Sequence, residues 1–424
     1  MRSAGRWCGW VALCALAGCG PRAAIDGGAG DGGGGADAGA GADAGDAAAS
    51  ADAGPIAPLP TAAECPAAPP PEIGVPGGFG DDLFDLAWRW SPGDATSWAP
   101  FVYVTIPPDA VSVAVVVDGG EAFTGFALLE MAGVTLVDRA ATDATGWGGD
   151  PFYHYPAVAG AIVIPMDETV LPAPGCLAIL PVLDGEDARG RPGHLHVVSR
   201  RGVAAPGALI DLNLFVVGPT TVTTAELDEA VQVASALWAA GGVGMVGQVR
   251  YLTAPGTGLV ATAGADIDAL RATDPGGDPR AVSVFFIDDF SDEAGTLGLA
   301  AGVPGPVGVS GTASSGVVLS ILSHLDATGT ALDTTLLGET MAHEVAHQLG
   351  LFHTTEADGL EHDFLPDTPE CTPADDADGD GLVSAEECVA LDGANLMFWI
   401  AGDFSQDQLS PIQADVLRAS PVAY

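Results

Sequence analysis

Lysine is absent from the chain, and arginine supplies all 13 basic residues against 56 acidic ones, for a formal net charge of −43. So acidic a protein repels the phosphate backbone, which excludes nucleic acid as a partner. It suits an extracellular setting rich in calcium, where cations screen the carboxylates. The 424 residues are enough for about two domains with additional segments.

Aromatic residues are missing between Gly20 and about Pro60, a stretch rich in glycine, alanine and aspartate. Such a composition cannot bury a hydrophobic core. We therefore expect a disordered tether over 19–72, whose negative charges repel one another, with the proline run at 69–71 as its stiffer end.

Residues 1–18 read as an export signal. Arg2 and Arg6 give a positive start, and residues 10–16 form an apolar run too short for a bilayer span of ~20 residues. The sequence Leu-Ala-Gly-Cys that ends at Cys19 resembles a bacterial lipobox; the alternative is an ordinary secretory signal with an incidental cysteine. The resemblance implies lipidation of Cys19 and anchoring in the bacterial cell envelope. Glycine rather than aspartate follows Cys19, which indicates the outer membrane, with secretion or release as the alternative.

Cleavage before Cys19 would leave four cysteines besides Cys19 itself, an even number for an oxidising compartment. Three pairings are possible. The most local joins Cys371 to Cys388, which leaves Cys65 to pair with Cys176. In a rival interpretation Cys65 is a latency thiol that caps a metal.

Residues 73–205 are expected to form an all-β sandwich domain that precedes the rest of the chain. Short alternating or β-branched runs recur there, separated by glycine, proline and aspartate. The clearest runs are 101–106, 111–117, 161–164, 177–180 and 195–198.

Four tryptophans of this segment are interpreted as packing residues, with an exposed aromatic binding face as the alternative: Trp88, Trp90, Trp98 and Trp147. His194 and His196 lie on the same side of a strand without a third ligand nearby, so we expect ordinary strand residues. The basic pair Arg200–Arg201 marks a domain boundary and a possible protease-sensitive junction.

The motif HEVAHQLGLFH, which begins at His343, carries the clearest chemical signal in the chain. On a helix, His343 and His347 project from one face, one turn apart, and can share a zinc ion. Gly350 can adopt a left-handed conformation that ends the helix and returns His353 as a third nitrogen ligand. Three protein ligands leave one position open for water, as in catalytic zinc sites. Glu344 would act as the general base on that water.

The surrounding residues favour a helix over three histidines at chance spacing. Thr330 or Asp333 can cap its start. An apolar row runs along the face opposite the histidines, made of Leu337, Met341, Val345 and Leu349.

This motif resembles that of the metzincin zinc endopeptidases, and later stretches narrow the resemblance to the pappalysin family. Residues 363–369, DFLPDTP, resemble the family's D-x-x-x-D-T-P segment. Residues 395–397 resemble its Met-turn, in which a methionine, here Met397, forms a floor beneath the zinc. Residues 407–417 resemble the closing helix. The resemblance covers roughly 209–424.

One position departs from the family pattern. Many pappalysins carry a tyrosine two residues after the Met-turn methionine, where this chain has Trp399. Tryptophan has no oxygen to offer a metal or an oxyanion, which places a tyrosine-type transition-state role in doubt and leaves zinc binding unaffected.

The resemblance implies an α+β metzincin-like catalytic domain over 206–424, with a twisted mixed sheet, a zinc helix and a C-terminal subdomain. We expect a helix at 224–240 and strands at 209–218, 248–252, 281–290 and 316–321. In such a domain an edge strand pairs with the extended substrate. Gly316–Ile321 is the candidate edge strand, with an interior strand as the alternative.

Residues 376–387, DADGDGLVSAEE, fit a twelve-residue calcium loop. Oxygen ligands fall at positions 1, 3, 5, 9 and 12, with a backbone carbonyl at 7 and glycine at 6. The alternative is an acidic turn in an acidic protein. The calcium ligands would be Asp376, Asp378, Asp380, Leu382, Ser384 and Glu387.

These patterns together predict a zinc-dependent endopeptidase, held at the cell surface or in the periplasm, with Zn²⁺ and Ca²⁺ as cofactors. Its partners would be a protein or peptide substrate and the membrane, which it contacts only through a lipid anchor; we expect a monomer. One alternative is a non-catalytic, calcium-stabilised adhesin that retains the protease fold, against which the intact Glu344 argues. Another is that the β domain binds carbohydrate or protein and delivers the enzyme.

Overall fold

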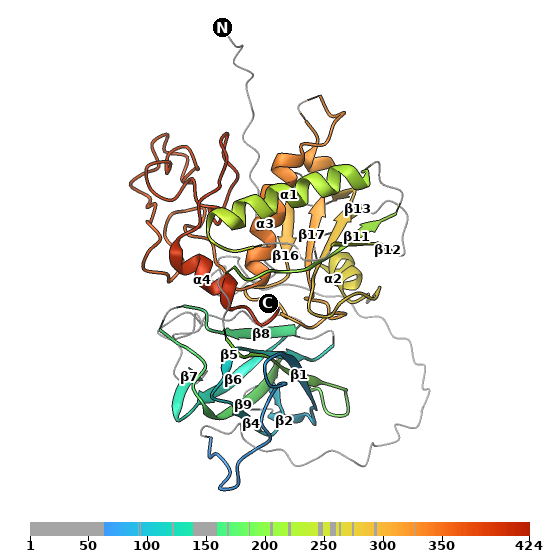
Figure 1. Cartoon of the computed structure of the whole chain (residues 1–424), viewed down its shortest axis with the longest axis vertical. Coiled ribbons are helices and arrows are strands. Elements are labelled where there is room, and N and C mark those ends of the chain that lie inside the picture. Colours follow the sequence, from blue (N-terminus) through green and yellow to red (C-terminus); the bar gives the residue numbers. More distant parts are fainter. Residues whose placement is uncertain are drawn as a thin grey trace, which may run out of the picture.

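The computed structural model describes residues 63–424 except 92, 94, 121–122, 139–158, 168, 186, 204–206, 219–221, 245–248, 255–259, 263, 274, 292–294 and 327. The expected export signal, Cys19, Trp147 and most of the expected tether lie outside the described residues. The described part is a mixed α+β structure, in which a β-rich region (63–203) lies against an α/β region (207–424) (Figure 1).

Two antiparallel sheets make up the β-rich region. In one, the strand order is β1 (Phe79–Asp85), β10 (His194–Arg201), β5 (Ala110–Asp118), β8 (Ala159–Ile164). In the other it is β2 (Arg89–Ser91), β3 (Thr96–Trp98), β9 (Gly175–Asp184), β6 (Thr124–Met131), β7 (Val134–Asp138), and β9 also pairs with β4 (Val102–Ile106).

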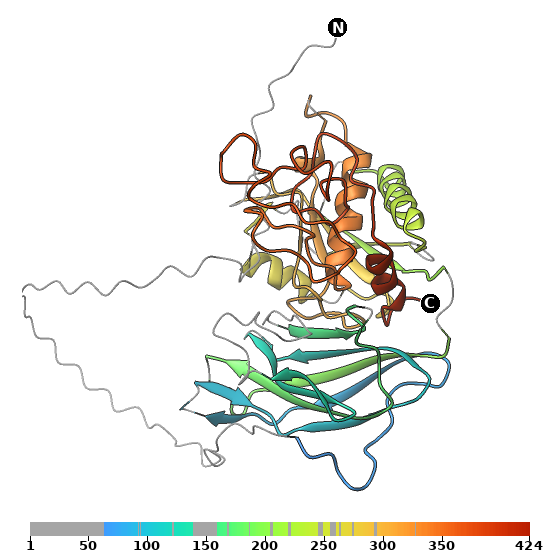
Figure 2. The same ribbon diagram turned by 90° about the vertical axis from the view of Figure 1, so that its left-hand side faces the viewer.

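The strands β5 and β8 are rich in apolar residues because both of their faces are covered. All six residues of β8 are buried, and β5 is buried from Ser112 to Val117. Such continuous apolar runs are expected of strands packed on two sides. In Figure 2 β8 lies at the side of the β-rich region that meets the α/β region.

Polar and apolar contacts join the two regions. The guanidinium of Arg200 donates to the carbonyl of Arg418, 2.8 Å away, and the amide of Ala159 donates to Oγ of Ser314 at 3.1 Å. One hydrophobic cluster continues from β5, β8 and β10 into the α/β region. Arg200 is buried and Arg201 forms ion pairs with Glu72 and Asp109, so the expectation of a protease-sensitive junction at this pair is wrong.

The main sheet of the α/β region has the order β12 (Val249–Ala254), β11 (Leu212–Val217), β14 (Val282–Ile287), β17 (Val317–Ser320), β16 (Gly298–Ala300). The first four strands are parallel and β16 is antiparallel to β17. The expected edge strand, residues 316–321, is therefore interior, and its apolar residues at 317–319 fit a strand with neighbours on both sides. The edge belongs to β16, whose three residues are too few to reveal a strand period.

Alternate residues of these strands face two different helical layers. On β14, Val284 and Phe286 face the helices α1 (Thr224–Ala240) and α3 (Thr334–Gln348), which pack together. Between them Phe285 faces the other side, where the helix α2 (Ala265–Arg271) contributes Ile267 and Leu270. Figure 2 shows α1 and α2 on opposite sides of the region. A two-residue pair, β13 (Val260–Ala261) and β15 (Asp289–Phe290), and the 3-10 turn η1 (Leu322–His324) complete this part.

After α3 the chain is largely irregular until α4 (Pro411–Ala419). Ser410 caps α4 in a capping box with Gln413, and Pro411 occupies the first turn, so sequence alone sets its start. Among the described residues, no helix combines the length and apolarity needed to cross a membrane.

Candidate metal centre

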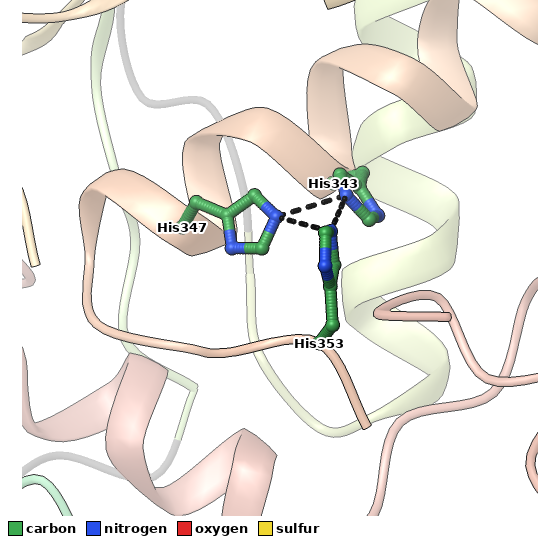
Figure 3. Close-up of side chains that lie close together, drawn as sticks. All are labelled: His343, His347 and His353. Carbon is green, nitrogen blue, oxygen red and sulfur yellow. Dashed lines mark hydrogen bonds between the residues drawn. The ribbon is translucent and has the colours of Figure 1, made fainter. Parts of the chain in front are cut away.

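The helix α3 presents two of the three histidines. Of the two predicted caps, Asp333 is the one used: its side chain accepts from the amides of Thr335 and Leu336. The predicted apolar row is fully buried and fixes the rotation of the helix about its axis, through Leu337, Met341, Val345 and Leu349. His343 and His347 consequently project from one face of α3 (Figure 3).

A Schellman turn returns the third histidine. Gly350 has a φ of +111°, and its amide donates to the carbonyl of His347, while the amide of Leu351 donates to Ala346. A residue with a side chain would be strained at that φ, which explains the glycine. The reversal brings His353 alongside the helix, as the sequence predicts.

The three histidines converge on a common point. Their Nε2 atoms lie 3.0 Å apart for the pairs that include His347 and 3.3 Å apart between His343 and His353 (Figure 3). Nitrogens bound to one tetrahedral zinc at 2.0–2.1 Å would lie about 3.3 Å from each other. The spacing therefore fits three imidazoles around one ion.

Each histidine also has its second ring nitrogen tied to an acceptor. Nδ1 of His343 lies 2.7 Å from the carbonyl of Leu396, and Nδ1 of His347 lies 2.6 Å from that of Leu351. Nδ1 of His353 lies 3.0 Å from a carboxylate oxygen of Glu356 (not predicted from the sequence). Carbonyl and carboxylate oxygens only accept, so every Nδ1 carries the hydrogen and every neutral ring directs an Nε2 lone pair inward. Three converging lone pairs repel one another, and a cation relieves that repulsion.

Burial keeps two of these imidazoles neutral. It lowers the pKa of His343 to about 3, with a further contribution from His353, and it lowers the pKa of His347 well below its ordinary value. Neutral imidazole is the form that binds metals, so the site is prepared for an ion at neutral pH.

Glu344 follows the first histidine and is 4% exposed. Its carboxylate accepts from the amide of Ala300 on β16, and its Oε2 is buried with no partner among the described residues. Burial raises its pKa to about 7, against the opposing effects of His353, Ala300 and Arg271. A buried carboxylate with one free oxygen can take up a proton at that oxygen. Glu344 is therefore better suited to proton transfer than to binding the metal.

The segment of the predicted Met-turn adjoins two of the histidines through its backbone. Met397 is fully buried, its amide donates to Oδ1 of Asn395, and its carbonyl accepts from the amide of Thr354. The preceding carbonyl, of Leu396, is the one that holds His343. The turn therefore positions a predicted ligand.

The DFLPDTP segment connects the site to the last helix. Asp367 accepts from Oγ of Ser410 at 2.8 Å and from the amide of Ile412 at 2.9 Å, at the N-terminus of α4. Asp363 accepts from Oγ1 of Thr368 at 2.5 Å, and burial raises the pKa of Asp363 to about 7. Both aspartates thus have structural roles.

An open pocket of about 550 Å³, counting the part continuous with solvent, lies beside the histidines. His343 and Glu344 line it together with Gly298 of β16, Glu339 and Trp399. The indole N–H of Trp399 donates to the carbonyl of Val383, 2.7 Å away. The residue at the family's tyrosine position therefore anchors the acidic loop to the pocket wall.

The predicted calcium ligands lie in one exposed loop. Carboxylate oxygens of Asp376, Asp378 and Asp380 come within 4.8 Å of one another. Asp376 accepts from the amides of Gly379 and Gly381, and Glu387 accepts from the amides of Ala377 and Ser384. These bonds connect the two ends of the loop. The other two predicted ligands, Leu382 and Ser384, lie between those ends in the sequence.

Both cysteine pairs expected from the sequence form. Cys371 is joined to Cys388 with 5.7 Å between Cα atoms, and Cys65 to Cys176 with 6.4 Å. A free latency thiol at Cys65 is thereby excluded. The second disulfide also attaches the residues around Cys65 to β9, although the sequence placed them in the tether.

Other sequence candidates are structural. Trp88 and Trp98 are buried, so they do not form an exposed aromatic face. His194 pairs with Asp85 and His196 with Asp81 on neighbouring strands, as ordinary strand residues would.

Comparison with known proteins gives little help. No protein-family model and no curated protein sequence matches the chain. Metalloproteinase-II from Bacteroides fragilis aligns over 53% of this chain and 62% of its own, under two thirds of its length, at 12% identity and a TM-score of 0.31. The protein YxiM of Bacillus subtilis aligns over 50% of this chain and 55% of its own, at 13% identity and a TM-score of 0.15. TM-scores this low do not establish a shared fold, so the function proposed next depends on the histidine site itself.

Proposed function

We propose that the protein is a zinc-dependent endopeptidase of the pappalysin-like metzincin type. One observation carries the proposal: three imidazoles bring their Nε2 atoms to one point, beside a buried carboxylate with a free oxygen. Three nitrogen ligands of this kind suit zinc, and they leave one coordination position for chemistry.

When bound, zinc would lower the pKa of a water to ~7 and polarise a carbonyl oxygen. The protein would supply the remaining functions. Glu344 would accept the proton of the attacking water and pass it to the leaving amine. Its burial excludes competing solvent, and the adjoining pocket would receive a substrate side chain. The open edge of β16 would pair with the extended backbone of a substrate, the role first assigned to residues 316–321.

The test is Glu344→Gln in the purified protein, with a peptide library as substrate. We expect one zinc per chain in wild type and variant, because Glu344 is not a ligand. The rate of peptide hydrolysis should fall by about 10²-fold to 10⁴-fold, the usual contribution of a general base. Glu229→Gln, on the exposed side of α1, is the matched control and should retain full activity. Undiminished hydrolysis in Glu344→Gln, after removal of contaminating proteases, would refute the mechanism.

We also propose that residues 376–387 bind calcium. The proposal is supported by the three carboxylates that approach one another and by the completeness of the twelve-residue pattern. The disulfide Cys371–Cys388 brackets the loop, and Trp399 connects it to the pocket wall. Calcium would therefore stabilise one side of the active site without contacting the histidines.

Finally, we propose that the mature protein is a monomer anchored to the bacterial envelope through a lipid on Cys19. This rests on the lipobox-like sequence alone. Cys19→Ser should transfer the protein from the membrane fraction to the soluble fraction, measured by fractionation of expressing cells. Equal membrane retention of variant and wild type would show that residues 1–18 are not a lipoprotein signal.

A further inference from the structure

Arg271, the last residue of α2, is a buried cation outside the histidine site. It is 4% exposed, and burying a guanidinium is costly unless it is hydrogen-bonded. One amino group donates to the carbonyl of Leu299, 2.6 Å away, and the other lies 4.0 Å from Asp268. Burial lowers the pKa of Arg271 to about 10, so the side chain stays protonated at neutral pH. The main partner of this charge is therefore a backbone carbonyl of the edge strand β16.

The same peptide group contacts Glu344 on its other side. The carbonyl of Leu299 accepts from Arg271, and the next amide, of Ala300, donates to the Glu344 carboxylate. A guanidinium that polarises the carbonyl also strengthens donation by the amide, because hydrogen bonds in a chain reinforce one another. The strand is also packed tightly here: a Cβ on Gly298 would lie 2.7 Å from Cγ of Glu344.

We propose that Arg271 is a positioning residue for Glu344, acting through the Leu299–Ala300 peptide. It holds β16 in register with the carboxylate and fixes one carboxylate oxygen, while Oε2 stays available for a proton. The effect of Arg271 on catalysis rests on the proposed peptidase function. The hydrogen bonds that connect Arg271 to Glu344 do not depend on that function.

The chain offers a matched control for losing a buried arginine. Arg200 is 7% exposed and donates to the carbonyl of Arg418 at 2.8 Å, where the two regions meet. Arg271→Met and Arg200→Met each remove a buried guanidinium that donates to backbone carbonyls, and each keeps an apolar chain of similar length. Arg271→Lys retains the charge and one donor, without the planar fork.

In the zinc-loaded protein we expect Arg271→Met to lower kcat by about tenfold to a hundredfold, the usual range for a misplaced catalytic group, with KM changed less than threefold. Arg271→Lys should recover part of the loss. Arg200→Met should lower the melting temperature without changing kcat, and zinc content should stay at one per chain in all three. Equal kcat values for Arg271→Met and Arg200→Met would overturn the proposal.

A second measurement does not require activity. Amide hydrogen exchange of residues 296–301 in the metal-free protein, followed by mass spectrometry, should accelerate at least tenfold in Arg271→Met and in Glu344→Ala. Combining the two changes should add little, because both break one chain of hydrogen bonds. If the exchange rates of the two single variants add fully in the double variant, or if Arg271→Met does not accelerate exchange, the proposed hydrogen-bonded connection between Arg271 and Glu344 is wrong. That conclusion would hold even if the wild type proved to be an active protease. If the exchange rates are non-additive as expected but the wild type hydrolyses no peptide, the proposed function is rejected and the connection between Arg271 and Glu344 stands.

Discussion

The histidine site and the acidic loop 376–387 both gather atoms that can bind a metal, but different parts of the chain hold them in place. In the first, one ligand is oriented by a distant group, because the carbonyl that accepts from His343 lies 53 residues further along the chain. The acceptors for His347 and His353 are local. In the second, the carboxylates of Asp376 and Glu387 accept from amides of the same loop. The first is buried and the second largely exposed. Folding prepares the histidine site, whereas local sequence prepares the loop, so the two should respond differently to substitution.

The largest expected difference follows removal of a histidine. His347→Ala should abolish zinc binding and peptidase activity, because Nε2 of His347 is the atom closest to both other ligands. Losing a metal present at a thousandfold excess over its Kd would remove about 4.1 kcal/mol of stability. Metal analysis and thermal unfolding with and without zinc would measure both effects. The calcium response of His347→Ala should match that of the wild type; a lost calcium response would show that the two sites are not independent.

A smaller loss of zinc binding is expected when Glu356, the hydrogen-bond acceptor for the ring of His353, is changed. Glu356→Gln weakens the acceptor for Nδ1 of His353 while keeping its size. Zinc affinity should fall by about tenfold to a hundredfold, as it does when such supporting carboxylates are changed. Competition with a zinc chelator would measure it. Glu361→Gln, on the same segment, is the control and should bind zinc like the wild type. Equal affinities in the two variants would show that the backbone turn alone positions His353.

The smallest effect should come from the loop. At a hundredfold excess over its Kd, calcium should stabilise the fold by about 2.7 kcal/mol, and Glu387→Ala should remove most of this gain. Thermal unfolding at constant zinc, with and without calcium, is the measurement, with the exposed Glu370→Gln as control. Zinc occupancy should not change. An identical calcium response in Glu387→Ala and wild type would identify the loop as an acidic turn.

What the sequence could predict follows the same division. His343, His347 and His353 were found because their spacing and Gly350 act within eleven residues, and the calcium loop because it is contiguous. Arg271 was missed because its partner is set by packing: it reaches a carbonyl 28 residues away. Glu356 lies only three residues after His353, so the sequence did offer it as a partner and it was overlooked.

The order of the strands in the sheet could not be predicted from local sequence patterns either. The edge position of β16 depends on which strand pairs with which, and three residues carry no periodic signal. The apolar run at 317–319 did contain the correct information, because an edge strand with one open side would show more polar residues.

The hydrophobic cluster that runs through both regions bears on how the protein unfolds. Val115 of β5 and Met341 of α3 belong to the same cluster, so separating the regions would expose apolar surface on each at a cost of roughly 25 cal/mol per Å². Cooperativity should therefore extend across the whole described chain rather than stop at the junction near Arg201. A metal held by α3 would then protect the β-rich region from proteolysis, and a molecule bound to the β-rich sheets would lower the population of open histidine sites.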